Sequence, residues 1–316
     1  MAVRFHLPGL RYNFPINMIL LNMKQRFPQY FREGVEIASF FGEFPTSLWN
    51  GGRFSGGDQC DARFVKEVIR QYNGQGVPIR YTYTNPNITK EDLKDPYCNF
   101  CMEAANNGMN EVIVYSEILE EYIRKNYPKF KINSSTCKEI RTYDDVNNEL
   151  KKDYKTVVLD FNLNNRFEEY EQITDTKRCE VLVNACCQPN CPRRAEHYRF
   201  INKQQRIELE NRTLPIEQRK QVPIWRCSYG EKTSLYITKQ YETHISPELI
   251  WEKYVPMGFE NFKIEGRTAN IFLLIDTYCY YMMKPEYRDE ARMLFLSNLE
   301  VNHLVTVNKP RPGVWP

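Results

Sequence analysis

Eight short segments of the chain are rich in β-branched and aromatic residues, and most are followed by an amphipathic segment. This alternation is typical of repeated βα units around a parallel sheet. We expect strands in residues 3–9, 35–42, 79–85, 111–116, 131–136, 156–162, 179–185 and 261–267, and helices in residues 17–26, 62–73, 90–107, 117–126, 144–153 and 270–283. The pattern predicts an α/β protein with a TIM-like (β/α)8 barrel, and a doubly wound sheet is the alternative.

Two of the expected helices follow residues that favour a helix N-terminus. Thr89 precedes an acidic turn, and Thr142 precedes two aspartates. A threonine hydroxyl can accept a hydrogen bond from a free backbone N–H, and carboxylates stabilise the positive end of a helix. We therefore expect Thr89 and Thr142 to cap the helices that follow them.

The connection between the seventh and eighth expected strands is much longer than the others. This insertion covers about residues 188–260 and contains a highly polar stretch, helical or loop-like, before "VPIWRCSYG". Long insertions after barrel strands usually lie over the active face, at the C-terminal ends of the strands. We expect one domain, residues 1–316, with a long insertion after strand 7 on that face.

The composition limits the classes of protein to which the chain can belong. Hydrophobic residues make up 42% and aromatic residues 14%, which indicates a folded core and excludes disorder. The 43 basic and 40 acidic residues give a net charge of +3, so nothing favours general nucleic-acid binding. The first residues lack a signal-peptide pattern, and their apolar run is too short to cross a bilayer. We expect a cytoplasmic protein without a membrane partner.

The ten cysteines are interpreted for a reducing compartment, where disulfides are rare. Cys98 and Cys101 form a C-x2-C pair inside an expected helix with aromatic neighbours, and we favour buried core thiols for this pair. Cys186, Cys187 and Cys191 follow the seventh strand in "NACCQPNCPRRAEHY". The C-x3-C spacing is wide for a zinc ribbon and compatible with iron–sulfur ligation.

A metal site would need ligands from more than one segment. Cys227 lies near the end of the insertion, and His197 follows the cysteine-rich turn. The candidate ligands of a 4Fe–4S cluster are Cys187, Cys191 and Cys227, with Cys186, Cys60 or Cys179 as the fourth. Zinc with His197 as a ligand is an alternative, and thiols without a metal are a third possibility.

Polar residues stand at the C-terminal end of every expected strand, where barrel enzymes place their reacting groups. In the eighth strand, Lys263, Glu265 and Arg267 share one face, so they form either a structural ion network or a cluster that binds an anionic or polar substrate. The candidate catalytic residues are Glu43, Asp160, Lys263 and Glu265, and the candidate substrate-binding residues are Arg53, Tyr83, Asn85, Asn184 and Arg267.

Several phrases of the sequence resemble the collagenase-like peptidase U32 family. They are the strand end "VLVN" before a cysteine-rich turn, "GEFP…GGR" after the second strand, and "HISPELIWEKYVPMGFENFKIEGRT" at residues 244–268. The resemblance implies a TIM-barrel-like fold. Relatives in this family act in anaerobic ubiquinone hydroxylation and in RNA base hydroxylation, and those of the ubiquinone branch carry a 4Fe–4S cluster. The resemblance therefore implies oxygen-independent hydroxylation. Carried over by position, that cluster falls on Cys187, Cys191 and Cys227, whereas the peptidase signature is replaced by "ACCQPNCPRR".

Three hypotheses follow. The first is an iron–sulfur enzyme that carries out redox or hydroxylation chemistry on a small or RNA-borne substrate. The second is a metal- or thiol-dependent peptidase or other hydrolase, with a zinc-activated water or with Cys187 as the nucleophile beside His197. The third is a non-catalytic protein whose insertion binds a protein or RNA. The insertion can also serve a redox or protein partner in the first hypothesis.

Overall fold

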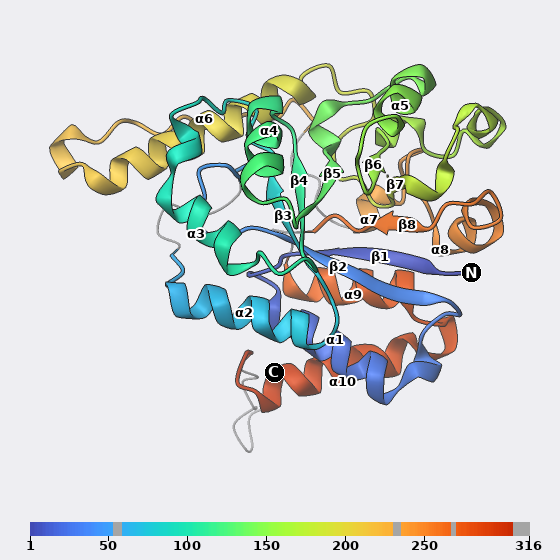
Figure 1. Ribbon diagram of the computed structural model, residues 1–316. Coiled ribbons are helices and arrows are strands. Elements are labelled where there is room, and N and C mark those ends of the chain that lie inside the picture. Colours follow the sequence, from blue (N-terminus) through green and yellow to red (C-terminus); the bar gives the residue numbers. More distant parts are fainter. Residues whose placement is uncertain (53–58, 230–234, 267–269, 306–316) are drawn as a thin grey trace.

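The computed structural model of this protein describes residues 1–52, 59–229, 235–266 and 270–305. Its centre is one sheet of eight parallel strands in the order β5-β4-β3-β2-β1-β8-β7-β6 (Figure 1). The strands are β1 Val3–Pro8, β2 Val35–Gly42, β3 Ile79–Tyr83, β4 Glu111–Val114, β5 Lys131–Ser134, β6 Val157–Val158, β7 Cys179–Leu182 and β8 Asn261–Lys263. This cyclic order of consecutive strands is that of a TIM-like barrel, so the doubly wound alternative is wrong.

The barrel is nearly closed between β5 and β6. The backbone N–H of Ser134 donates to the carbonyl of Thr156 at 2.9 Å, and the N–H of Lys155 donates to the carbonyl of Ile132 at 2.7 Å. Both bonds use residues just before the two-residue strand β6, so the ladder continues beyond the strand itself. At these positions, backbone groups of the two edge strands pair with each other.

Helices surround the strands. The expected helices are present as α1 Phe14–Arg26, α2 Ala62–Gly74, α3 Pro96–Ala104, α4 Glu117–Asn126, α5 Tyr143–Leu150 and α9 Ile271–Met282. The further helices are α6 Arg194–Thr213, α7 Leu235–Thr238, α8 Pro247–Leu249, which continues into a π-helical turn at Ile250–Tyr254, and α10 Arg288–Val301. In Figure 1, α1, α2, α9 and α10 cover the β1–β2 side, and α4 and α5 lie on the opposite side.

The two expected helix caps have different outcomes. Thr142 caps α5, because its hydroxyl accepts a hydrogen bond from the N–H of Asp145 at 3.2 Å. The prediction for Thr89 is wrong, because α3 begins at Pro96 and its cap is Asp95, whose carboxylate accepts from the N–H of Cys98 at 2.7 Å. A proline at the first helical position fixes the start of a helix and disfavours the helical conformation of the preceding residue.

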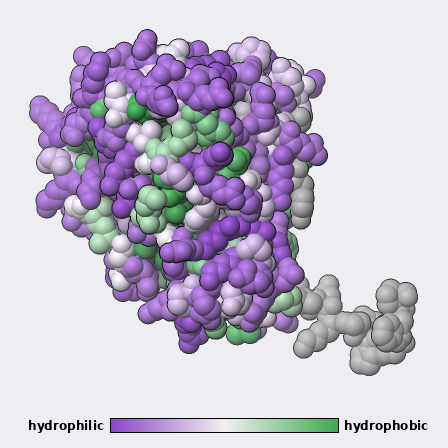
Figure 2. Space-filling model, turned by 90° about the vertical axis from the view of Figure 1, so that its right-hand side faces the viewer, coloured by the Kyte–Doolittle hydropathy of each residue, from purple (hydrophilic) through white to green (hydrophobic). Residues whose placement is uncertain are grey.

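The main apolar core lies between the strands and the helices. Cys98 and Cys101 are fully buried in it, as free thiols, and burial raises the pKa of Cys101 to about 12. Figure 2 shows one face of the molecule, where hydrophilic side chains dominate and hydrophobic ones gather in the middle of the view. In the part of the chain that the structure describes, no helix is both long enough and apolar enough to cross a membrane.

Candidate functional site

The C-terminal ends of the strands open into a cavity of about 650 Å³. Residues of the strands and of the turns that follow them form its floor and walls, and the insertion supplies its other side. Lining residues from the barrel include Phe41, Thr82, Thr84, Ile113, Ser135, Leu182, Lys263 and Glu265, and those from the insertion include His197, Tyr198, Ile201, Gln205, Trp225 and Cys227. The cavity thus lies at the barrel end where related architectures carry out chemistry.

Polar contacts hold α6 over this cavity. The side chain of Arg194 is 2% exposed and forms an ion pair with the buried carboxylate of Asp160 at the end of β6. Two nitrogens of Arg206 contact the two carboxylate oxygens of Asp92 at 3.1 and 2.7 Å. The amide of Gln205 donates to the carbonyl of Ser47 at 3.2 Å. A helix that is polar on most sides is therefore fixed by buried and half-buried hydrogen bonds more than by apolar packing.

Cysteines from two distant segments line the cavity. Cys187 packs against the small apolar cluster of Phe161, Leu182 and Ala185. Burial raises the pKa of Cys187 to about 12, and the neighbouring Cys191 thiol adds to the increase. Cys227, from the end of the insertion, is exposed at the cavity. The three expected metal ligands, Cys187, Cys191 and Cys227, therefore border one cavity.

Arg193 marks the place where the two segments meet. Its guanidinium lies near the thiols of both Cys191 and Cys227, and it lies over the Trp225 ring, 4.2 Å from the ring centroid. Nη1 of Arg193 also donates to the hydroxyl of Ser228 at 3.4 Å. Positive charge and hydrogen-bond donors of this kind stabilise anionic thiolates.

The candidates for a fourth ligand lie in different places. Cys186 lines the cavity, and its thiol donates to the carbonyl of Asn184 at 3.6 Å. Cys60 is not among the described lining residues. It lies just before α2, where the hydroxyl of Tyr97 donates to its carbonyl at 3.4 Å. Cys179 is buried at the start of β7, the opposite end of that strand from the cavity. Cys137, which sequence reasoning missed, lines the cavity after β5.

The chemistry of this donor set fits an iron–sulfur cluster or zinc, since both are bound by thiolates. Among the described residues, no three histidine, cysteine or carboxylate side chains are gathered closely enough to hold a metal ion as they stand. The thiols share one cavity, so metal ligation would require movements of their side chains.

The same geometry bears on the thiol-peptidase alternative. A nucleophilic cysteine needs a lowered pKa, whereas the pKa of Cys187 is raised. The His197 ring is stacked on the Trp225 ring, with their centroids 4.7 Å apart. A half-buried thiol against an apolar cluster, such as that of Cys187, is a weak nucleophile until a metal ion displaces its proton.

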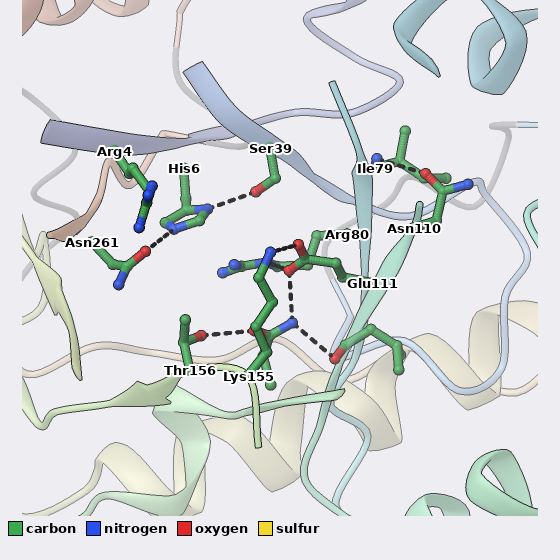
Figure 3. A network of polar contacts seen from close by, with 12 residues as sticks. Arg4, His6, Ser39, Ile79, Arg80, Asn110, Glu111, Lys155, Thr156 and Asn261 are labelled. Carbon is green, nitrogen blue, oxygen red and sulfur yellow. Dashed lines mark hydrogen bonds and ion pairs between the residues drawn. The ribbon is translucent and has the colours of Figure 1, made fainter. Parts of the chain in front are cut away.

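Below the cavity, charged side chains and a histidine form a network in the barrel interior, which Lys155 joins from a partly exposed position (Figure 3). We call them the barrel-floor network: His6, Arg80, Glu111, Lys155, Glu180 and Lys263. Nε of Arg80 lies 3.0 Å from Glu111 Oε2, and Arg80 also pairs with Glu180. Nζ of Lys263 lies 3.3 Å from Glu180 Oε1, and Lys155 pairs with Glu111. Lys263 thus links this network to the cavity, of which it is a lining residue.

Burial and neighbouring charges set the protonation states in this network. Burial and the adjacent Arg80 lower the pKa of His6 to about 3, so His6 is neutral at pH 7. His6 is held between the hydroxyl of Ser39 at 2.7 Å and the amide oxygen of Asn261 at 3.2 Å (Figure 3). Burial alone would raise the pKa of Glu180, but the nearby Arg80 and Lys263 outweigh it and lower that pKa. The network therefore holds three cations and two carboxylates.

The other expected catalytic residues are placed as follows. The carboxylate of Glu265 accepts from the backbone N–H of Cys186 at 2.8 Å and faces the cavity. Glu43 is buried and accepts from the Thr82 hydroxyl at 2.7 Å. Asp160 is engaged by Arg194 and also caps the turn after β6, where it accepts from the N–H of Asn162 at 2.9 Å.

The expected substrate-binding residues lie mostly outside the cavity lining. Asn184 joins the ends of β7 and β8, since it accepts from the N–H of Glu265 at 2.7 Å and donates to its carbonyl at 3.0 Å. Tyr83 lies in the core outside the barrel, stacked on Tyr81 with ring centroids 5.0 Å apart. Asn85 donates to the carbonyl of Leu48 at 2.8 Å within a turn. Arg53 and Arg267 lie outside the described residues.

Comparisons with known proteins do not assign the chain to a family. No family model matches the chain. No curated protein matches it. The chain is similar to a solved structure of the U32 peptidase Mk0906, with 12% sequence identity and a TM-score of 0.46. The match covers 84% of this chain and 92% of the Mk0906 chain. The assignment of the chain to the α/β class, as a TIM-like barrel, rests on its own strand order.

Proposed function

We propose that this protein is an iron–sulfur enzyme that carries out oxygen-independent redox or hydroxylation chemistry on an organic substrate bound in the cavity. The observation that carries the proposal is the convergence of Cys187 and Cys191, after β7, with Cys227, from the returning segment of the insertion, on one cavity at the C-terminal barrel end. Cysteines that only fill the apolar core are not expected to cluster at the C-terminal end of the barrel.

The residues have separate roles in this proposal. Cys187, Cys191 and Cys227 hold the cluster, and Cys186 or Cys137 supplies the fourth thiolate, because both line the same cavity. When bound, a 4Fe–4S cluster supplies one-electron transfer at a potential that nearby hydrogen bonds and charge adjust.

The rest of the cavity binds and orients the substrate. Lys263 supplies a positive charge at the floor, with its ammonium 4.7 Å from the centroid of the Phe41 ring. Phe41, Ile113 and Leu182 offer apolar surface, and Thr82 offers a hydroxyl. A substrate with an apolar body and an oxygen-rich group satisfies both kinds of wall. The helix above, α6, limits access of water to the bound substrate.

Proton transfer falls to Glu265 in this arrangement. Its carboxylate lines the cavity and is oriented by the N–H of Cys186. Asp160 was an equal candidate from the sequence, but its carboxylate already neutralises Arg194. The carboxylate of Glu43 accepts a hydrogen bond from the hydroxyl of Thr82, and it is Thr82 that lines the cavity. A general acid or base must lie within hydrogen-bond reach of the proton that it moves, and Glu265 meets this condition best.

A series of cysteine variants tests the proposal. The protein is purified without oxygen, and iron and acid-labile sulfide are measured for wild type, Cys187→Ser, Cys191→Ser, Cys227→Ser and the matched control Cys60→Ser, a half-buried thiol outside the cavity lining. We expect the three cavity variants to lose most of their iron and the control to keep it. Iron retained by all variants, or absent from the wild type, would contradict the proposal.

A further inference from the structure

One part of the insertion, residues 193–229, has a charge opposite to that of the rest of the molecule. We call residues 193–229 the arm: it consists of α6 and the segment that returns along it. The arm contains nine Arg and Lys residues and four Glu residues, a net charge of +5. The whole chain has a net charge of +3, so the remaining residues sum to −2. In Figure 1 the arm extends away from the barrel at the left, beyond α3 and α4.

The outer side of α6 carries part of this charge. A cleft of about 450 Å³ lies there, bordered by Asn87, Glu196, Arg199, Phe200, Lys203 and Arg206. Arg206 is paired with Asp92. Arg199 and Lys203 are exposed, and no ion pair with either side chain is found in the part of the chain that the structure describes. Two unpaired cations one helical turn apart favour an anionic partner.

The returning segment of the arm exposes large apolar side chains. Ile216 is 80% exposed, Ile224 is 82% exposed and Tyr229 is 42% exposed. Phe200 connects the two surfaces, because it borders the cleft and also packs on Trp225, with ring centroids 5.1 Å apart. Exposed isoleucines gain nothing from a phosphate backbone, whereas an apolar centre with a charged rim is typical of protein interfaces.

We propose that the arm is a docking surface for an acidic electron-carrier protein. The acidic character of the partner follows from the charge of the arm, and its being a protein follows from the exposed Ile216 and Ile224. That it carries electrons rests on the proposed function, because Cys227 and Arg193 lie on the arm where it meets the cavity. The docked carrier would lose one electron and the protein's redox centre would gain one, with no bond made or broken.

The test measures docking directly, with fluorescently labelled flavodoxin, an acidic electron carrier, as the probe. Binding to the metal-free full-length protein is followed by fluorescence anisotropy at salt concentrations of about 50 and 500 mM, since salt screens charge complementarity. One double variant removes the exposed apolar groups, Ile216→Ser with Ile224→Ser. A second removes the unpaired cations, Arg199→Gln with Lys203→Gln.

Matched controls change similar residues elsewhere. Phe272→Ser alters a half-exposed side chain near the start of α9, and Lys125→Gln with Lys129→Gln removes two exposed cations at and just beyond the end of α4. We expect each arm variant to weaken flavodoxin binding by at least about tenfold, high salt to weaken it for wild type, and the controls to bind as wild type does.

Two results would overturn the docking surface. One is flavodoxin binding that is absent from wild type or unchanged in both arm variants. The other is arm-dependent binding of labelled poly-uridine RNA that is tighter than that of flavodoxin, which would assign the arm to nucleic acid. The assay uses metal-free protein, so docking is measured independently of the cluster. Arm-dependent flavodoxin binding would support the docking surface even if the protein purified without oxygen contained no iron, a result that would contradict only the cluster.

Discussion

At the scale of single residues, the charged side chains inside the barrel depend on one another. Arg80 is completely buried and pairs with both Glu111 and Glu180, and Lys263 pairs with Glu180 from the cavity side. Each of these charges would be very unfavourable alone, since burial removes its hydration. The sequence showed Lys263, Glu265 and Arg267 on one strand face, but Glu180, the partner of Lys263, comes from β7 and is itself paired with Arg80 of β3, an arrangement that only the fold produces.

Replacing Arg80 with Met should strongly destabilise the protein, because Glu111 and Glu180 would keep buried charges without their shared partner. We expect a loss of about 3–5 kcal/mol in the free energy of unfolding, measured by urea denaturation. Adding Glu180→Gln to Arg80→Met should recover part of the loss, because it removes one of the two carboxylates that lost Arg80. A loss below about 1 kcal/mol for Arg80→Met would contradict the network.

His6 should make the stability depend on pH. The pKa of His6 is about 3 when folded and 6.5 ordinarily, so between these values the unfolded chain binds a proton that the folded chain does not. Stability from neutral His6 is therefore present above pH 6.5 and is lost as the pH falls towards 3. Between pH 4 and pH 5.5 the slope of unfolding free energy against pH should be shallower in His6→Asn by about 1.4 kcal/mol per pH unit. Equal slopes would show that His6 titrates normally.

Two cavity residues show what sequence reasoning could not supply. Cys137 follows the expected fifth strand, and its position there was the available signal, but it stands alone among polar residues. Arg194 was visible next to Arg193, yet its pairing with Asp160 joins residues 34 positions apart. A long-range ion pair leaves no local pattern, so Asp160 was equally consistent with proton transfer and with anchoring α6.

At the scale of elements, α6 determines the shape of the site. Its hydrophobic periodicity is weak, which is why the sequence left the segment helical or loop-like. The helix is fixed by Arg194, Gln205 and Arg206, whose partners lie on separate barrel loops. The strands, in contrast, were predicted at all eight positions. A parallel strand that is buried on both faces is a short run of β-branched and aromatic residues, which is easily recognised in a sequence.

The Asp160→Asn variant tests the anchoring of α6. Loss of this carboxylate leaves Arg194 buried without its main counter-charge, so the first turns of α6 should open more often. We expect hydrogen exchange followed by mass spectrometry to be faster in residues 194–206, with little change in β1 to β4. The matched control is Asp153→Asn, whose side chain is 99% exposed. Unchanged exchange in α6 would show that the helix is held by other contacts.

At the scale of the whole molecule, the connection between β7 and β8 brings its two cysteine-containing segments together at the barrel mouth. Cys191 precedes α6, and the segment that returns along α6 brings Cys227 back to the mouth beside Arg193. The barrel was predictable, because the alternation of strands and helices recurs along the chain. The convergence of the thiols was not, because it depends on the length and direction of α6. The expectation of one domain stays a prediction.

The measurement that tests the central claim most directly is the iron and acid-labile sulfide content of the wild-type protein after purification without oxygen. The account predicts a brown protein with about four iron and four sulfide per chain, whose visible absorption falls on reduction by dithionite. Iodoacetamide should then fail to alkylate Cys187, Cys191 and Cys227 until a chelator removes the iron. A colourless, iron-free protein whose Cys227 reacts at once under the same conditions would contradict it.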